Sequence, residues 1–231
     1  MGRLPQRDVD ARLKETWMHG DIAQEGGGYT FLGHVLAEKE CRRWSRGSAV
    51  ALSPDARRAW ERADSKQLTF GPRIPATRRI ADGPTKRPLT ISLVCAFALD
   101  SGRPHDEKGA YAGNLQRCIQ ACGRAILVVG TGAGASIGVR NSHDTRGTDG
   151  YRLCGQNSFE RESLACHHLR TFLWASRLCA ATMFYRKIAR GEHASACGTW
   201  HHFRTGTRYQ LGHFFVEQTD MKRVRDVGPV N

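Results

Sequence analysis

The sequence lacks a hydrophobic stretch long enough to cross a membrane. Its longest apolar run, Leu89–Leu99, is much shorter than the roughly 20 residues that a transmembrane helix needs. Residues Met1–Asp8 contain no apolar core of the kind that a secretory signal carries. We therefore expect no membrane partner and an intracellular location, in the nucleus or the cytoplasm.

Closely paired cysteines are also missing. The chain has 8 cysteines, and none forms a C-x-x-C pair, so the pattern predicts no disulfide framework. His193, Cys197 and His201 would share one face of a helix, and Cys166 with His167 and His168 would offer a fourth zinc ligand. Scattered buried cysteines and surface histidines explain the same residues. We therefore assign no metal site.

Acidic residues are few. The chain has 22 Asp and Glu against 35 Lys and Arg, which gives a formal net charge of +13. An excess of this size attracts polyanions such as nucleic acid. Because the basic residues are spread along the whole chain, a solvated surface explains them better than a binding patch does. The charge is compatible with nonspecific nucleic-acid contact and says nothing about the fold.

Residues 1–105 are predicted to be a basic, largely irregular and partly helical extension. Short helices are expected over Ala11–Met18 and Gly33–Trp44, and a third over Pro54–Asp64 with Ser53 as its cap. The proline-rich segment 71–88 is interpreted as a linker.

The following segment, Leu89–Phe97, has strand composition. From about residue 106 the pattern becomes regular. Apolar residues at helical spacing predict a helix over 108–122, which Gly123 ends. A buried strand over Ala125–Val129 follows.

Two helices are expected within Leu164–Arg190, meeting near Ala175–Ser176, and a second strand over Leu211–Val216. The fold class predicted from these elements is α/β. It comprises a partial Rossmann-like nucleotide-binding domain over residues 106–231, preceded by the extension.

The strand 125–129 runs directly into a glycine turn. Gly132, Ala133 and Gly134 have little or no side chain, so their backbone N–H groups are predicted to approach the phosphates of a ligand. Ser136 would add a hydroxyl hydrogen bond. The same stretch continues to an acidic and a basic residue, Asp144 and Arg146.

The order of these motifs resembles the sirtuin (Sir2-like) family. The resemblance rests on three motifs of the glycine-turn region and on four later positions in the same order. They are Thr131-Gly-Ala-Gly-Ala-Ser136, Asp144-x-Arg146, Gly150-Tyr151, Phe184-Tyr185, His202-Phe203, Gly212 and Thr219. The match covers roughly residues 107–231.

The resemblance implies an NAD-dependent deacylase that transfers an acyl group from a protein lysine to ADP-ribose. It implies that Gly132, Ala133, Gly134 and Ser136 hold the NAD pyrophosphate, and that Asp144 and Arg146 line the nicotinamide side. The partner would be an acylated-lysine protein. The family's zinc is held by C-x-x-C pairs, which this chain lacks, and no residue matches the family's catalytic histidine. No catalytic residue is therefore assigned.

Three other interpretations remain open. The segment Thr131–Gly138 also resembles the T-G-x-x-x-G-I-G turn of short-chain dehydrogenases, which would give an NAD(P)-binding domain. A basic, non-enzymatic chain that binds nucleic acid or a protein would explain the charge. A glycine turn without any function arises often by chance.

Overall fold

The structure is a computed structural model that describes most of the segments with regular secondary structure. It describes residues 11–16, 22–26, 28–34, 47–64, 67–71, 73–82, 88–98, 104–137, 153–155, 166–185, 200–201, 205–206, 208–225 and 227. The chain divides into two compact units. The first comprises Met1–Ala96 and Arg117–Leu127, and the second comprises Phe97–Gln116 and Val128–Asn231. The predicted domain boundary between residues 105 and 106 stays a prediction.

The first unit contains a four-stranded antiparallel sheet with the strand order β1-β4-β3-β2. Its strands are β1 (Ala11–Thr16), β2 (Ile22–Gly26), β3 (Tyr29–His34) and β4 (Gly47–Leu52). Strand β4 is central because it pairs with both β1 and β3. Its small and branched residues are buried, as is Leu32 of β3, so this sheet contributes one layer of the unit's core.

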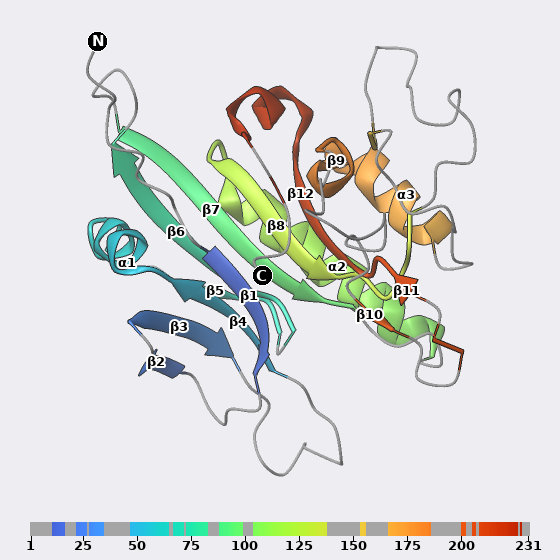
Figure 1. Cartoon of the computed structure of the whole chain (residues 1–231), viewed down its shortest axis with the longest axis horizontal. Helices are drawn as coiled ribbons and strands as arrows, with labels where there is room; N and C mark the ends of the chain where they lie inside the picture. The colour runs from blue at the N-terminus through green and yellow to red at the C-terminus, as the bar shows by residue number, and fades with distance from the viewer. Residues whose placement is uncertain are drawn as a thin grey trace. The chain divides into compact units, whose positions relative to one another are not determined.

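Three further strands and one helix complete the ordered part of this unit. They are α1 (Pro54–Glu61), β5 (Gln67–Thr69), β6 (Pro75–Asp82) and β7 (Pro88–Phe97). The three strands are neighbours in the order β5-β6-β7, and both pairings are antiparallel. Helix α1 packs along β6, beside which it lies in Figure 1. Its Ala56 and Ala59 are buried and form the apolar face that this packing needs.

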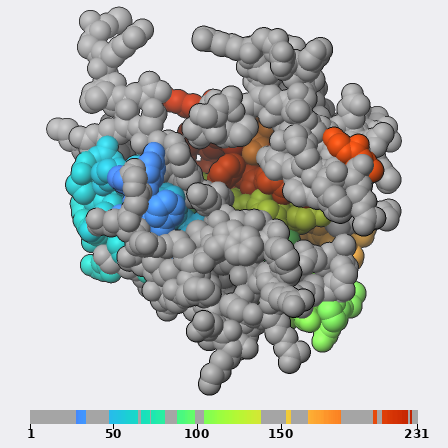
Figure 2. Space-filling view, turned by 60° about the horizontal axis from the view of Figure 1, so that its bottom comes forward, coloured from blue at the N-terminus to red at the C-terminus, as the bar shows by residue number. Residues whose placement is uncertain are grey.

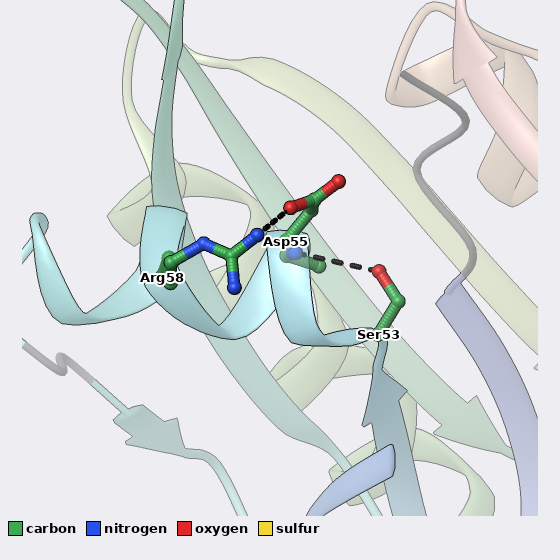
Figure 3. Close-up of polar contacts among 4 residues, drawn as sticks. Ser53, Asp55 and Arg58 are labelled. Carbon is green, nitrogen blue, oxygen red and sulfur yellow. Dashed lines mark hydrogen bonds and ion pairs between the residues drawn. The ribbon is translucent and has the colours of Figure 1, made fainter. Parts of the chain in front are cut away.

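The start of α1 is stabilised by local polar contacts (Figure 3). The hydroxyl oxygen of Ser53 accepts a hydrogen bond from the backbone N–H of Ala56 at 3.3 Å. Pro54 occupies the first turn, where no hydrogen bond is lost. Asp55 forms an ion pair with Arg58, and their side chains are 52% and 63% exposed, so this pair contributes little to stability. The segment lies at the surface in Figure 2, in cyan.

The second unit is built around three neighbouring strands in the order β8-β12-β9. Its strands are β8 (Ile126–Gly132), β9 (Leu178–Ala180) and β12 (Gly212–Glu217). Strand β12 is antiparallel to both neighbours. A parallel bridge between Cys154 and Ala180 makes the pairing in this unit mixed.

Helices and short strands accompany this sheet. The elements are α2 (His105–Cys122), α3 (Cys166–Ala175), the 3-10 turns η2 (Ala181–Met183) and η4 (Gln218–Arg223), and the two-residue strands β10 (Trp200–His201) and β11 (Arg208–Tyr209). Helix α2 contributes its residues up to Gln116 to this unit and the remainder to the first. Helix α3 packs beside β9 (Figure 1). Within the described segments, no helix is both long and apolar enough to span a membrane.

Several predicted elements are confirmed. Helix α1 has Ser53 as its N-cap, and α2 ends at Cys122, followed by Gly123 with a left-handed φ of +61°. Strands β7, β8 and β12 lie where apolar runs predicted them. Helix α3 ends at Ala175 as expected.

The predicted irregular, partly helical extension is wrong. Ala11–Thr16, within the predicted helix Ala11–Met18, forms a strand, because pairing with β4 outweighs the weak helical spacing of a short segment. Of the predicted helix Gly33–Trp44, Gly33 and His34 belong to β3, and residues 35–46 lie outside the described residues. The predicted linker 71–88 contains β6. Pro75 and Pro88 are the first residues of β6 and β7, a strand position that tolerates proline.

The second unit also corrects the prediction of a partial Rossmann-like domain. A Rossmann half-domain has parallel strands, whereas β8 pairs with β12 in the antiparallel direction over five residue pairs. The second helix expected after Ser176 is replaced, over the described residues, by β9 and η2.

Gly155 generates a prediction about packing in the second unit. An added Cβ would lie 2.2 Å from the carbonyl oxygen of Met183 and 2.6 Å from the Cα of Phe184. Because both atoms belong to the backbone, we expect Gly155→Ala to destabilise the protein by about 2 kcal/mol or more, a fall of roughly 4–8 °C in Tm for a chain of this size. Thermal unfolding followed by circular dichroism measures this shift.

Gly113→Ala is the matched control. An added Cβ at Gly113, inside α2, meets nothing within 4 Å, so this substitution should leave Tm unchanged or raise it, since alanine favours a helix over glycine by about 1 kcal/mol. Equal Tm values for the two variants would contradict the close contact at Gly155.

A second prediction concerns the cap of α1. Ser53→Ala removes the acceptor for the N–H of Ala56 and should cost about 1 kcal/mol, whereas Ser53→Gly should cost only a few tenths. Urea unfolding of the two variants tests this order. A free energy of unfolding that is unchanged in Ser53→Ala would show that the hydroxyl does not act as a cap.

Candidate functional site

The candidate site lies in the second unit, where β8 ends against β12. Gly132 is paired with Gly212, and Thr131 with His213. Because directly opposed residues of two paired strands point to the same face, Thr131 and His213 share the inner face. Both are buried, with 8% and 2% of their surface exposed. The pairing therefore brings two polar side chains into an otherwise apolar strand pair.

The segment after β8 is fixed by hydrogen bonds of its backbone. The carbonyl oxygen of Gly132 accepts from the N–H of Ala98 at 3.0 Å, and the N–H of Ala133 donates to the carbonyl oxygen of Leu211 at 2.8 Å. Gly134 has a φ of +59°, a left-handed conformation that favours glycine. The turn is thus tied to the residue preceding β12.

Gly132 also meets a close neighbour. A Cβ on this residue would lie 3.0 Å from the ring of Phe97, which leaves little room for a side chain. After the turn, Ala135, Ser136 and Ile137 are at most 1% exposed. The chain thus passes from the turn straight into the core.

His213 connects this turn to the rest of the unit. Its Nε2 lies 3.2 Å from the carbonyl oxygen of Ala135, and its Nδ1 lies 3.4 Å from the hydroxyl oxygen of Thr182. Because a carbonyl oxygen only accepts, Nε2 carries the proton and donates to Ala135. The ring also stacks on Phe215 with a centroid separation of 5.8 Å. His213 therefore links β12, the glycine turn and η2.

Burial sets the charge of His213. Loss of hydration lowers its pKa from 6.5 to about 4, although the backbone carbonyl groups of Ala135 and Gln210 act in the opposite direction. The imidazole is consequently neutral at physiological pH. A neutral, almost fully buried ring is suited to positioning the turn and is not exposed to exchange protons with solvent.

The structure describes four of the six predicted cofactor-binding residues. Gly132, Ala133, Gly134 and Ser136 are consecutive or nearly so, and the N–H of Ala133 already has an acceptor in Leu211. Asp144 and Arg146 lie outside the described residues. A role for the six in binding a cofactor stays a prediction.

No three His, Cys, Asp or Glu side chains lie together within the described ranges. Two of the possible zinc ligands considered from the sequence, His193 and Cys197, lie outside these ranges. Burial raises the pKa of Cys95 and of Cys179 to about 12, so neither thiol is a ready nucleophile.

The fold is similar to solved structures of endonucleases. AP endonuclease LMAP from Leishmania major superimposes with a TM-score of 0.57 and 13% identity, over 88% of this chain and 66% of that one. The Xenopus laevis APE2 catalytic domain gives a TM-score of 0.50 and 8% identity, over 86% and 69%. At these identities the likeness defines the fold alone, a mixed α/β fold of the endonuclease type.

A third similar structure is the endonuclease domain of TRAS1, a telomere-specific non-LTR retrotransposon, with a TM-score of 0.49 and 14% identity, over 84% of this chain and 69% of that one. No protein-family model matches the sequence. No curated protein matches it either.

These comparisons overturn the sirtuin interpretation. The similar structures are endonucleases, so the predicted Sir2-like family, the Rossmann-like fold and the NAD-dependent deacylase function are wrong. An acylated-lysine partner has no support. The short-chain-dehydrogenase alternative and the basic, non-enzymatic chain do not match either. The glycine turn misled because a strand followed by small residues is a local pattern, and the direction of the neighbouring strand is not encoded in it.

Sequence reasoning did not identify His213. The available signal was its place in the apolar strand Gly212–Glu217, where it alternates with Phe214 and precedes the buried Phe215. A polar residue at an inward position of such a strand requires a hydrogen-bonding partner. The sequence pattern therefore predicts that His213 has a buried hydrogen-bonding partner, but it does not identify that partner.

The low pKa of His213 makes stability depend on pH. Below pH 6.5 the unfolded chain binds a proton at this residue that the folded chain does not take up until about pH 4. Stability is therefore fully present above pH 6.5 and falls as the pH drops toward 4, by about 2 kcal/mol between pH 7 and pH 5. His213→Gln, whose amide can still donate a hydrogen bond, should lose this pH dependence.

Urea unfolding of both proteins at pH 7, 6 and 5 measures the effect. Other titrating groups contribute equally to the two proteins, so the difference between their curves isolates His213. Parallel curves would show that His213 is not held neutral by burial.

Proposed function

We propose that this chain acts on the phosphodiester backbone of nucleic acid, as a nuclease-type domain. The observation that carries the proposal is the fold likeness to an AP endonuclease, which extends over 88% of the chain, and to the APE2 catalytic domain, which extends over 86%. The fold alone does not define a reaction. A second, independent property therefore matters, and it is the charge.

The charge of the chain suits a polyanionic substrate. The formal net charge is +13, and neutralisation of phosphates with release of counterions supplies most of the affinity of nonspecific nucleic-acid binding. Exposed basic side chains occur among the described residues of both units. They include Arg58 and Arg62 at α1 and Lys222, Arg223 and Arg225 at and after η4.

The described side chains would support the reaction indirectly. His213 holds the turn after β8 through Ala135, and Leu211 holds the same turn through Ala133. These contacts keep the end of β8 and the start of β12 in fixed register. Nuclear or cytoplasmic location, where nucleic acid occurs, stays a prediction.

The test uses the full chain and two labelled DNA duplexes, one containing a single abasic site and one intact. We expect binding that weakens at least tenfold between about 50 and 200 mM salt, and strand scission of the bound duplex. Fluorescence anisotropy measures binding, and denaturing electrophoresis measures scission. Binding without scission of either duplex would overturn the catalytic part of the proposal, and salt-independent or absent binding would overturn all of it.

A contaminating nuclease is excluded by the packing variants. If this chain performs the scission, the activity should be lost at the temperature at which the chain unfolds. The temperature at which half of the activity is lost should therefore be lower for Gly155→Ala than for the wild type, and it should not be lower for Gly113→Ala. A midpoint identical in all three preparations would assign the activity to a contaminant and contradict the proposal.

A further inference from the structure

Two cysteines of α2 form a buried pair in the first unit. Cys118 and Cys122 lie four residues apart, on one face of the helix. They are 0% and 2% exposed, and their thiols are hydrogen-bonded to each other. Both thiols are free. The pair plays no part in the candidate site of the second unit.

A cation and a hydroxyl group face this pair. The guanidinium of Arg78, on β6, donates hydrogen bonds to the carbonyl oxygens of Ala121 and Cys122, both at 3.2 Å. Ser92 is directly opposite Arg78 in the β6–β7 ladder, so the two side chains lie on the same face of this strand pair, and the buried hydroxyl of Ser92 has no hydrogen-bond partner within the described part of the chain. Among the described residues, no carboxylate forms an ion pair with Arg78. The positive charge beside the two sulfur atoms is therefore not balanced by a described acid.

We propose that Cys118 and Cys122 form a two-thiolate binding site for a soft monovalent cation, Cu(I). Thiolates are the ligands that select Cu(I). In the binding step two S–H bonds break, two Cu–S bonds form, and two protons pass to the solvent. No electron is transferred, because the copper enters and stays as Cu(I).

Coordination number and charge favour Cu(I) over Zn²⁺. Structural zinc takes four ligands, whereas no third ligand-type side chain joins this pair within the described ranges. Two thiolates and one Cu(I) carry a net charge of −1, which the guanidinium of Arg78 balances. With Zn²⁺ the metal and the two thiolates carry no net charge, so the half-buried guanidinium of Arg78 would gain no electrostatic partner.

A disulfide fits the pair less well. The Cβ atoms of residues four apart on a helix are about 5–6 Å apart, and a disulfide requires about 3.5–4.5 Å. Oxidation would therefore have to unwind the last turn of α2, whereas an ion between the two sulfurs would not. Gly123 and Arg124, which follow Cys122, are exposed, so fraying of this helix end would admit an ion to the buried pair.

The test titrates the reduced full chain, under anaerobic conditions, against the Cu(I)–bicinchoninate complex and follows the loss of its absorbance. We expect the wild type to take one equivalent of Cu(I) from the bicinchoninate complex. Cys118→Ser and Cys122→Ser should each fail to take this equivalent. Cys95→Ser is the matched control, since Cys95 is a buried thiol of the same unit outside the pair, and it should retain the equivalent. Retention of that equivalent by both serine variants of the pair would overturn the site.

Arg78 provides a readout that a structural role would not move. Arg78→Gln should weaken Cu(I) binding by roughly tenfold to a hundredfold and leave Zn²⁺ binding unchanged, and Arg78→Lys should restore the wild-type preference. An unchanged ratio of the two affinities would contradict the charge argument. If the serine variants do not fold, X-ray absorption of the copper-loaded wild type decides the matter: two sulfur ligands support the site, and three or more overturn it.

Discussion

Strand β12 is paired on both sides, with β8 and with β9, and this pairing determines where the residues of the candidate site lie. Side chains alternate along a strand, so the register places His213 and Phe215 on the inner face together with Thr131 and Val129. In this register, the turn after β8 brings the carbonyl oxygen of Ala135 to the ring of His213. A shift of one residue would move the whole inner set outward.

Local patterns predicted the elements that satisfy their own hydrogen bonds or bury a continuous apolar run. Helix α1 was predictable from Ser53 and Pro54, and α2 from apolar spacing that ends at Gly123. The first sheet was not predictable in this way. Its segments are short, and Ala11–Thr16 becomes a strand through pairing with β4, more than 30 residues away in the sequence. Such pairing depends on tertiary contacts and not on propensity.

The candidate site shows the same limit more clearly. A strand followed by Gly132, Ala133 and Gly134 is common to several nucleotide-binding folds, and the sequence does not state that the next strand in space is antiparallel. That direction separates the observed fold from a Rossmann domain. His213 lies far from the glycine turn in the sequence, so its contact with Ala135 could be found only from the structure.

The six described cysteines, Cys95, Cys118, Cys122, Cys154, Cys166 and Cys179, are all buried thiols outside any disulfide. They are distributed over both units, and none can react with a bulky thiol reagent without some opening of its surroundings. Each is consequently an intrinsic reporter of local unfolding at its own position. The rate at which each thiol is labelled under native conditions would rank the local opening free energies across the fold, without any label having to be engineered into the chain.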